Sequence, residues 1–78
     1  MPEVFRAEGY VFSFYSNEGN EPLHIHVRRA GGFAKFWLEP LSLDYSHGMN
    51  TRELSRAEQL IADNLDCIRR KWDEAFHP

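Results

Sequence analysis

His24 and His26 are the residues of this sequence best suited to chemistry. They lie one residue apart in the segment Leu23–Arg29, where apolar and polar residues alternate. Because successive side chains of a β-strand point to opposite faces, both imidazole rings should project from the same face. Imidazole titrates near neutral pH and is a common metal ligand, so this pair could support either acid–base chemistry or metal binding.

A metal site is one interpretation of this pair. Two histidines on one strand face can ligate a single ion, but a third ligand must come from elsewhere in the chain. None of the candidates stands at a fixed spacing from the pair, so the sequence commits to no metal; His24 and His26 are the ligands if one binds. The cofactor therefore stays unknown. The candidate third ligands are Glu18, Glu21, Asp44, His47 and His77.

Acid–base cleavage of RNA is a second interpretation. One histidine would accept the proton of the attacking hydroxyl group and the other would protonate the leaving group. Arg28 and Lys35 are the supporting candidates, because a nearby cation can stabilise the charge of the phosphorane. The third interpretation is structural: the rings hydrogen-bond to the preceding polar loop, where Asn17 and Glu18 are suitable partners.

A sheet must position these histidines. The segment Tyr10–Tyr15 is rich in aromatic and β-branched residues, which favour strands. Phe33–Glu39 should pair as a hairpin with Leu23–Arg29 across the turn Ala30-Gly31-Gly32, and Pro40 should end it. Two shorter strands are expected at Val4-Phe5 and Leu41–Leu43, with a turn at Glu8-Gly9 and a loop through His47-Gly48. The core face of the second strand should consist of Tyr10, Phe12 and Phe14.

In the sheet, the aliphatic residues Leu23, Ile25 and Val27 should face the core. The row of His24, His26 and Arg28 should then face away from it, beside Lys35 and Trp37 of the paired strand. Phe33 shares the outer face with Trp37, and two such rings on an open face make a homo-oligomer an expected possibility.

The hydrophobic period changes to that of a helix from Thr51 onward. Asn50 or Thr51 can cap the start, and the segment can be one long helix or two helices broken near Asn64. We therefore predict an α+β fold in a single domain, residues 1–78. It has a small antiparallel sheet of three to five strands, followed by one long or two short C-terminal helices packed on one face. The apolar stripe consists of Leu54, Ala57, Leu60, Ile61, Leu65, Ile68, Trp72, Ala75 and Phe76.

The composition excludes several classes of protein. The net charge of −3 argues against a uniformly basic nucleic-acid binder. A single cysteine, Cys67, cannot form an internal disulfide, which favours a reducing compartment such as the cytoplasm. We expect no membrane association, since the sequence has neither a long apolar run nor a secretory signal.

Three segments together resemble the bacterial family known as domain of unknown function 4160. They are Phe14–Val27, Ala34–Pro40 and the C-terminal Trp72 and Phe76. The resemblance covers nearly the whole chain. One departure is Leu23, where the family often has a second proline. The positions that match the family signature are Asn17, Glu18, Pro22, His24, His26, Lys35, Trp37 and Glu39.

The resemblance implies a small bacterial cytoplasmic protein, without an established reaction. Such proteins are often encoded beside another small domain of unknown function (2442), and the pair has been proposed as a toxin–antitoxin module. A protein partner from a neighbouring gene is therefore implied, together with RNA or DNA as a target. Asn17, Glu18, Trp37 and Glu39 become candidate binding residues beside the histidines.

We therefore expect a toxin–antitoxin component that acts through a protein partner, with RNA-directed activity at the His-x-His strand. The alternatives are a metal-binding, hydrolase-like protein and a non-catalytic interaction module. Whether the chain is an enzyme stays open at this point.

Overall fold

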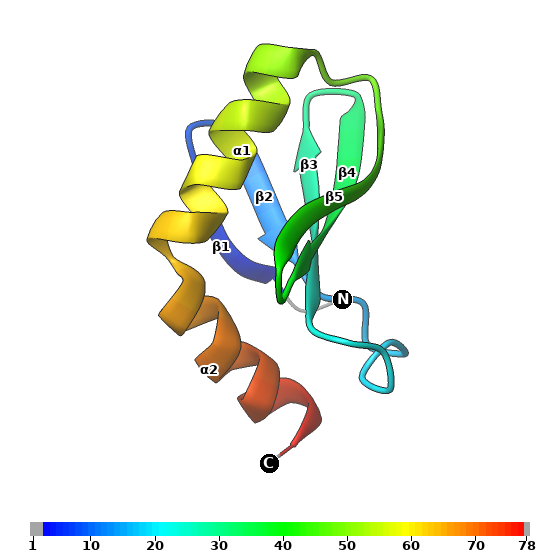
Figure 1. Cartoon of the computed structure of the whole chain (residues 1–78), viewed down its shortest axis with the longest axis vertical. Coiled ribbons are helices and arrows are strands. Elements are labelled where there is room, and N and C mark those ends of the chain that lie inside the picture. The colour runs from blue at the N-terminus through cyan, green and yellow to red at the C-terminus, as the bar shows by residue number, and fades with distance from the viewer. Residues whose placement is uncertain (1–2, 78) are drawn as a thin grey trace.

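The computed structural model describes residues 3–77, which form a five-stranded sheet followed by two helices (Figure 1). Every strand pairing is antiparallel, and the strands lie in the sheet in chain order, β1-β2-β3-β4-β5. The predicted α+β fold is confirmed, with five strands and two helices. The elements are β1 (Glu3–Ala7), β2 (Tyr10–Ser13), β3 (His24–Arg29), β4 (Gly32–Leu38), β5 (Leu41–His47), α1 (Thr51–Asp63) and α2 (Leu65–Phe76).

Two predicted turns join neighbouring strands. Glu8 and Gly9 between β1 and β2 both have positive φ angles, 55° and 84°. This combination matches the right-handed twist of a hairpin, and glycine adopts it without steric cost. Ala30, with φ 53°, begins the turn from β3 to β4.

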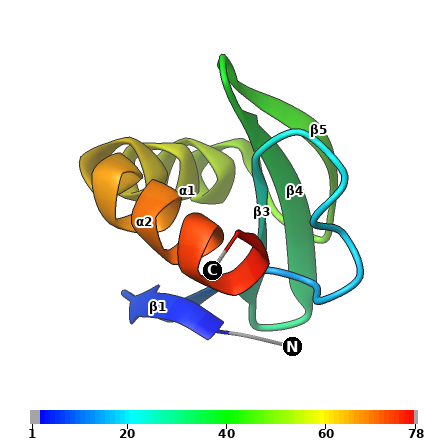
Figure 2. The same cartoon turned by 90° about the horizontal axis from the view of Figure 1, so that it is seen from below.

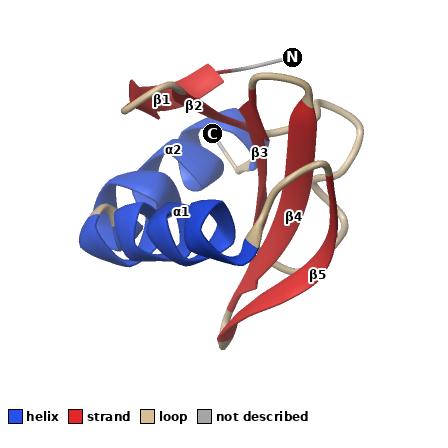
Figure 3. Cartoon of the chain, turned by 90° about the horizontal axis from the view of Figure 1, so that it is seen from above, coloured by secondary structure: helices blue, strands red, loops and turns tan. Residues whose placement is uncertain are grey.

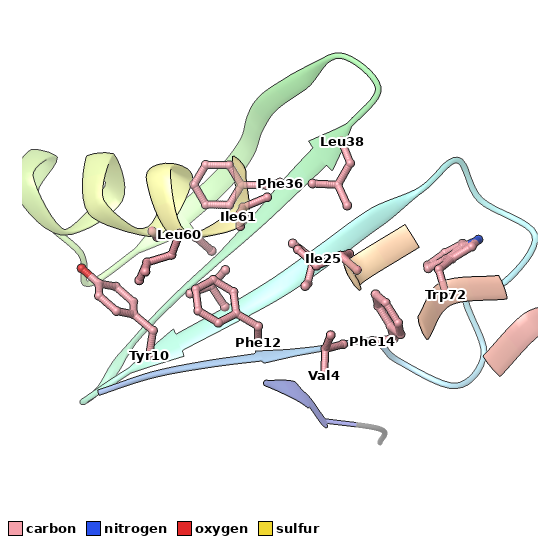
Figure 4. Packing of buried hydrophobic residues seen from close by; sticks show 14 residues of the cluster. Val4, Tyr10, Phe12, Phe14, Ile25, Phe36, Leu38, Leu60, Ile61 and Trp72 are labelled. Carbon is pink, nitrogen blue, oxygen red and sulfur yellow. The ribbon is translucent and has the colours of Figure 1, made fainter. Parts of the chain in front are cut away.

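Both helices cover the same face of the sheet, while β5 extends beyond them (Figures 2 and 3). The core lies between these layers (Figure 4). Tyr10, Phe12 and Phe14 are buried there, which confirms the predicted core face of β2. The same holds for Ile25 and Val27 of β3, both fully buried. The helices contribute Ala57, Leu60, Ile61, Ile68 and Trp72.

Asn50 caps α1 and Asn64 separates the two helices. The Asn50 side chain accepts a hydrogen bond from the backbone N–H of Glu53, whose carboxylate accepts one from the backbone of Asn50. This reciprocal pair satisfies two donors at the helix start. At Asn64 the chain breaks into a second helix, so the two-helix alternative is correct. Neither helix combines the length and apolarity needed to cross a membrane.

The structure corrects the prediction for the last strand. We expected only Leu41–Leu43 to be extended, with a loop through His47, but β5 continues to His47. The second half is polar and exposed, so it lacks the alternation on which strand prediction depends. Pairing with β4 holds it extended: Tyr45 lies opposite Lys35 and His47 opposite Phe33.

Gly32 and Gly48 bring the start of β4 against the chain that leads into α1. A Cβ atom on Gly32 would lie 2.5 Å from the carbonyl oxygen of Gly48, so the two backbones must separate to admit it. We expect Gly32→Ala to lower the free energy of unfolding by about 1–3 kcal/mol, the usual cost of overpacking. Urea denaturation measures this change.

Gly31→Ala is the matched control, because a Cβ atom there meets nothing within 4 Å. It should leave the stability nearly unchanged. Equal effects of the two substitutions would show that the close approach of Gly32 and Gly48 does not constrain the fold.

Candidate functional site

Glu18, His24 and His26 meet at the end of β3 nearest the polar loop, and we call these three residues the histidine–glutamate centre. Oε1 of Glu18 lies 2.8 Å from Nε2 of His24 and 2.7 Å from Nε2 of His26. One carboxylate oxygen therefore faces both rings. The two histidines come from alternate positions of one strand, and the glutamate comes from the loop before it.

The loop between β2 and β3 turns back to bring Glu18 over the strand. The backbone N–H of Glu18 donates to the carbonyl of Tyr15, and that of Glu21 donates to the carbonyl of Glu18. Pro22 then directs its carbonyl oxygen at Nδ1 of His24, at 2.8 Å. The turns of this loop thus place a carboxylate and a carbonyl oxygen against the two nitrogen atoms of one imidazole.

The histidines face away from Ile25 and Val27, as predicted, but their rings are not exposed to solvent. His24 is 0% exposed and His26 is 4% exposed. Strand alternation does place both on the face opposite Ile25 and Val27, but side chains from other elements cover them. The ring of Tyr15 stacks on His26 at 3.8 Å between centroids.

His24 lies between two tryptophans. Its ring centroid is 5.4 Å from Trp37 of β4 and 5.3 Å from Trp72 of α2, at steep angles to both. These edge-to-face contacts are the favourable geometry for aromatic rings. The second helix therefore reaches the histidine–glutamate centre directly, through Trp72.

The charges of the centre follow from its burial and hydrogen bonds. Burial raises the pKa of Glu18, but its interactions with the nearby rings of His24 and His26 outweigh that effect and leave the pKa below its ordinary value. Burial lowers the pKa of His26 by more than its hydrogen bond to the Glu18 carboxylate raises it. Glu18 is therefore a carboxylate at neutral pH, and His26 is a neutral ring.

Lys35 and Trp37 flank the centre on β4, as predicted, opposite His26 and His24 respectively. The ammonium of Lys35 lies 4.2 Å from the centroid of the Trp37 ring and 3.1 Å from the carboxylate of Glu21. Burial lowers the pKa of Lys35, but Glu21 and other nearby carboxylates raise it more, so the pKa is above its ordinary value. Lys35 is thus a fixed cation already engaged by protein groups.

Three predicted site residues lie elsewhere. Arg28 is exposed farther along β3, with no ion pair to any of residues 3–77. Glu39 forms an ion pair with Arg69 of α2 at 2.8 Å, so it joins sheet to helix. Asn17 is exposed, and its side chain makes no hydrogen bond within the described chain.

Among the five candidate third ligands, the structure brings Glu18 to the histidines. Glu21 and Asp44 pair with Lys35 instead. His47 stacks near Phe33, and His77 is exposed at the end of α2.

Sequence reasoning missed two side chains of this site and one backbone group. Tyr15 shares a strand face with Ser13, which lies opposite His26, so the β2–β3 register would have indicated its position. Trp72 was expected in the core stripe, and no sequence signal indicated that its ring also reaches His24. The carbonyl of Pro22 is a backbone acceptor, which residue types do not reveal.

A second feature lies on the outer face of β4 and β5. Phe33 is 5.5 Å from the ring of His47 and 6.2 Å from that of Tyr45, measured between centroids. We call these three residues the outer aromatic cluster. Phe33 and Tyr45 are 44% and 45% exposed, whereas Leu43, which is 44% exposed, lies opposite Phe36 on the other face of β5.

The comparison with protein families identifies the chain. The model described as "Domain of unknown function (DUF4160)" matches residues 9–73. The chain belongs to this family. The DUF4160 match runs from the β1–β2 turn into α2, so it includes the whole histidine–glutamate centre and the outer aromatic cluster. The comparisons with curated proteins and with solved structures gave no significant match.

Proposed function

We propose that this DUF4160 chain is a component of a toxin–antitoxin-type pair and binds a partner protein through β5 and the outer aromatic cluster. The observation that carries the proposal is the exposure of Phe33 and Tyr45, whose rings lie together on the outer face of β4 and β5 and are 44% and 45% exposed. Large apolar side chains gathered on one surface usually mark an interaction site. Aromatic residues are also enriched at the energetic centres of protein interfaces.

The edge of the sheet suits one kind of occupant. β5 pairs with β4 on one side, and no strand of residues 3–77 pairs with its other side. Such an edge offers unpaired backbone groups to an extended segment of another protein. Residues Leu41–His47 contain neither lysine nor proline; the protective features that they carry are one charge, Asp44, and the register shift opposite Lys35 and Phe36. The occupant we propose is a β-strand of the protein encoded by the neighbouring gene, which the family resemblance implies is a domain of unknown function 2442.

The burial of the histidine pair disfavours RNA-directed activity at His24 and His26. A phosphodiester must come within hydrogen-bond reach of the catalytic nitrogen atoms. Here Nε2 of both rings faces Glu18, and Nδ1 of His24 faces the carbonyl of Pro22. Partner binding, by contrast, uses side chains that are already exposed.

The proposal predicts that Phe33→Ser combined with Tyr45→Ser weakens binding of the neighbour-encoded protein by at least about tenfold. That factor corresponds to about 1.4 kcal/mol, which is modest for the loss of two aromatic contacts. Isothermal titration calorimetry with the two purified proteins measures it. Thermal unfolding should change little, since both side chains are half exposed.

Glu58→Ser on α1 is the control, because Glu58 is exposed on the helix that covers the opposite face of the sheet. This variant should bind the neighbour-encoded protein as tightly as the wild type does. The proposed surface is contradicted if the wild type does not bind that protein, or if the double variant binds it with unchanged affinity. If sedimentation shows that the wild type is a homodimer and the double variant is a monomer, the surface binds a second copy of the chain instead.

Growth assays test the toxin–antitoxin role separately. Expression of the chain with and without its neighbour should change bacterial growth in one of the two states. The same assay with the Phe33→Ser/Tyr45→Ser variant connects that effect to the outer aromatic cluster. Growth that is identical in every combination contradicts the toxin–antitoxin role.

A further inference from the structure

The geometry points to a divalent transition-metal site at Glu18, His24 and His26, of the kind that takes Zn²⁺. The three residues each offer one ligand atom, and these atoms all lie within 4.8 Å of one another. Two imidazole nitrogens and a carboxylate oxygen form a common zinc ligand set, with the fourth position left for water or another group. This inference is independent of the partner surface on β5.

The hydrogen bond from His24 to Pro22 determines which nitrogen is available. A backbone carbonyl can only accept, so Nδ1 of His24 must carry a proton that it donates to Pro22 at 2.8 Å. In a neutral ring, Nε2 then directs a lone pair at Oε1 of Glu18, 2.8 Å away. Two lone pairs at this distance repel each other, so a positive charge must lie between these atoms. A bound metal ion supplies it, and the alternative is a second proton on His24.

The arrangement around His24 is the one that metal-bound histidines adopt. Such a ring usually donates its remaining N–H to a carbonyl or carboxylate, which fixes its tautomer and orientation. Pro22 provides that acceptor. Trp37 and Trp72 pack against the ring of His24, which is fully buried. These contacts fix the ring so that Nε2 points toward Glu18.

His26 brings a second imidazole nitrogen to the same oxygen, so the centre offers three ligand atoms to one ion. Without a metal, a doubly protonated His24 and an Nε2–H tautomer of His26 would each donate a hydrogen bond to Glu18, and metal binding distinguishes the two states. A zinc ion with bonds of about 2.0–2.2 Å separates its ligand atoms by about 3.3 Å. The contacts of 2.7 and 2.8 Å are shorter. The Glu18 oxygen and the two histidine nitrogens would therefore have to move apart by about 0.5 Å to admit the ion. A carboxylate on a loop can adjust by that distance.

The site also suits the size of the protein. A domain of 78 residues buries a small core, and natural domains of this size are often reinforced by a metal. Here the ion would tie the loop that carries Glu18 to β3, and through the ring of His24 to Trp72 of α2. Its binding energy would add to the stability of the folded state, because the ligands come together only on folding.

The test uses the full chain without an affinity tag, stripped with EDTA and titrated with Zn²⁺ alone. We expect one ion per chain and a thermal midpoint that rises with zinc concentration. Tryptophan fluorescence should change with the same stoichiometry, because both Trp37 and Trp72 contact His24. Glu18→Gln should weaken binding at least about tenfold, since an amide replaces the anionic ligand.

Two variants serve as matched controls. Glu21→Gln removes a carboxylate from the same loop that bonds to Lys35 instead of the histidines, and should bind zinc like the wild type. Cys67→Ser removes the free thiol, which could bind zinc independently of the centre. Circular dichroism confirms that each variant is folded. If Glu18→Gln does not fold, the absorption spectrum of Co²⁺ bound to the wild type shows which ligands hold the ion. Visible bands without a thiolate charge-transfer band support the proposed nitrogen and oxygen ligands, and a thiolate band assigns the ion to Cys67 instead.

The absence of saturable zinc binding would overturn the inference and leave a protonated His24 as the source of the attraction. Binding of equal strength in the wild type and Glu18→Gln would also overturn it, because the ion would then be held elsewhere. Neither result bears on partner binding at β5, which is measured separately.

Discussion

Trp72→Ala should be among the most damaging single substitutions in this chain, with a loss of about 3–5 kcal/mol in the free energy of unfolding. Trp72 is 6% exposed and contacts Phe14 of the core edge-on at 5.2 Å and Phe76 at 4.4 Å, measured between ring centroids. Figure 4 shows its ring beside Phe14, at the end of the core that α2 covers. The substitution removes the contacts of α2 with the core and with His24 together.

The size of this effect matters because small domains have little stability to lose. At about 0.05–0.15 kcal/mol per residue, a chain of 78 residues is stable by about 4–12 kcal/mol. Urea denaturation followed by circular dichroism should therefore show a much lower unfolding midpoint for Trp72→Ala, and a wild type at the lower end of this range would be unfolded by the substitution near room temperature. Arg70→Ala, an exposed neighbour on the same helix, should differ from the wild type by less than about 0.5 kcal/mol. A Trp72→Ala protein of wild-type stability would mean that α2 contributes little to the fold.

His24→Ala should have the second-largest effect, a loss of about 2–4 kcal/mol in metal-free protein. The substitution leaves a cavity between Trp37 and Trp72, and it removes the hydrogen-bond partner of the Pro22 carbonyl. It also removes one of the two rings that face the Glu18 carboxylate. EDTA-treated protein in urea denaturation measures this contribution without any metal.

His47→Ala provides the comparison, because His47 is an exposed histidine on the outer face of β5. Its loss should change the stability by less than about 0.5 kcal/mol. Equal effects of the two substitutions would show that the burial of His24 has no energetic consequence, and would weaken the argument that the loop and Trp72 hold this ring in place.

The sheet could be predicted from the sequence because its signals are local. Alternation identified the core residues of β2 and β3, and glycine-containing turns marked the β1–β2 and β3–β4 hairpins. The change to a helical period marked the C-terminal segment, although residue types alone left one helix or two open. β5 was underestimated because its outer half is exposed on both faces, and only pairing with β4 keeps it extended.

The histidine–glutamate centre could be predicted in part. Strand spacing placed His24 and His26 on one face, and loop polarity made Glu18 a suitable partner. The burial of the rings could not be predicted, because it depends on Tyr15 stacking on His26 and on Trp72 arriving from a helix 48 residues after His24. For the same reason, Glu39 matched the family signature in sequence but pairs with Arg69 in space.

The strand order of the sheet has a consequence for how the protein folds. Because each strand pairs with the next one in the chain, every pairing closes over a short connection, an arrangement that favours rapid folding. The apolar face of the sheet, with Phe12 and Phe36, is buried only where the helices cover it. A chain in which the sheet forms before the helices dock would therefore expose this face, the most aggregation-prone surface of the molecule.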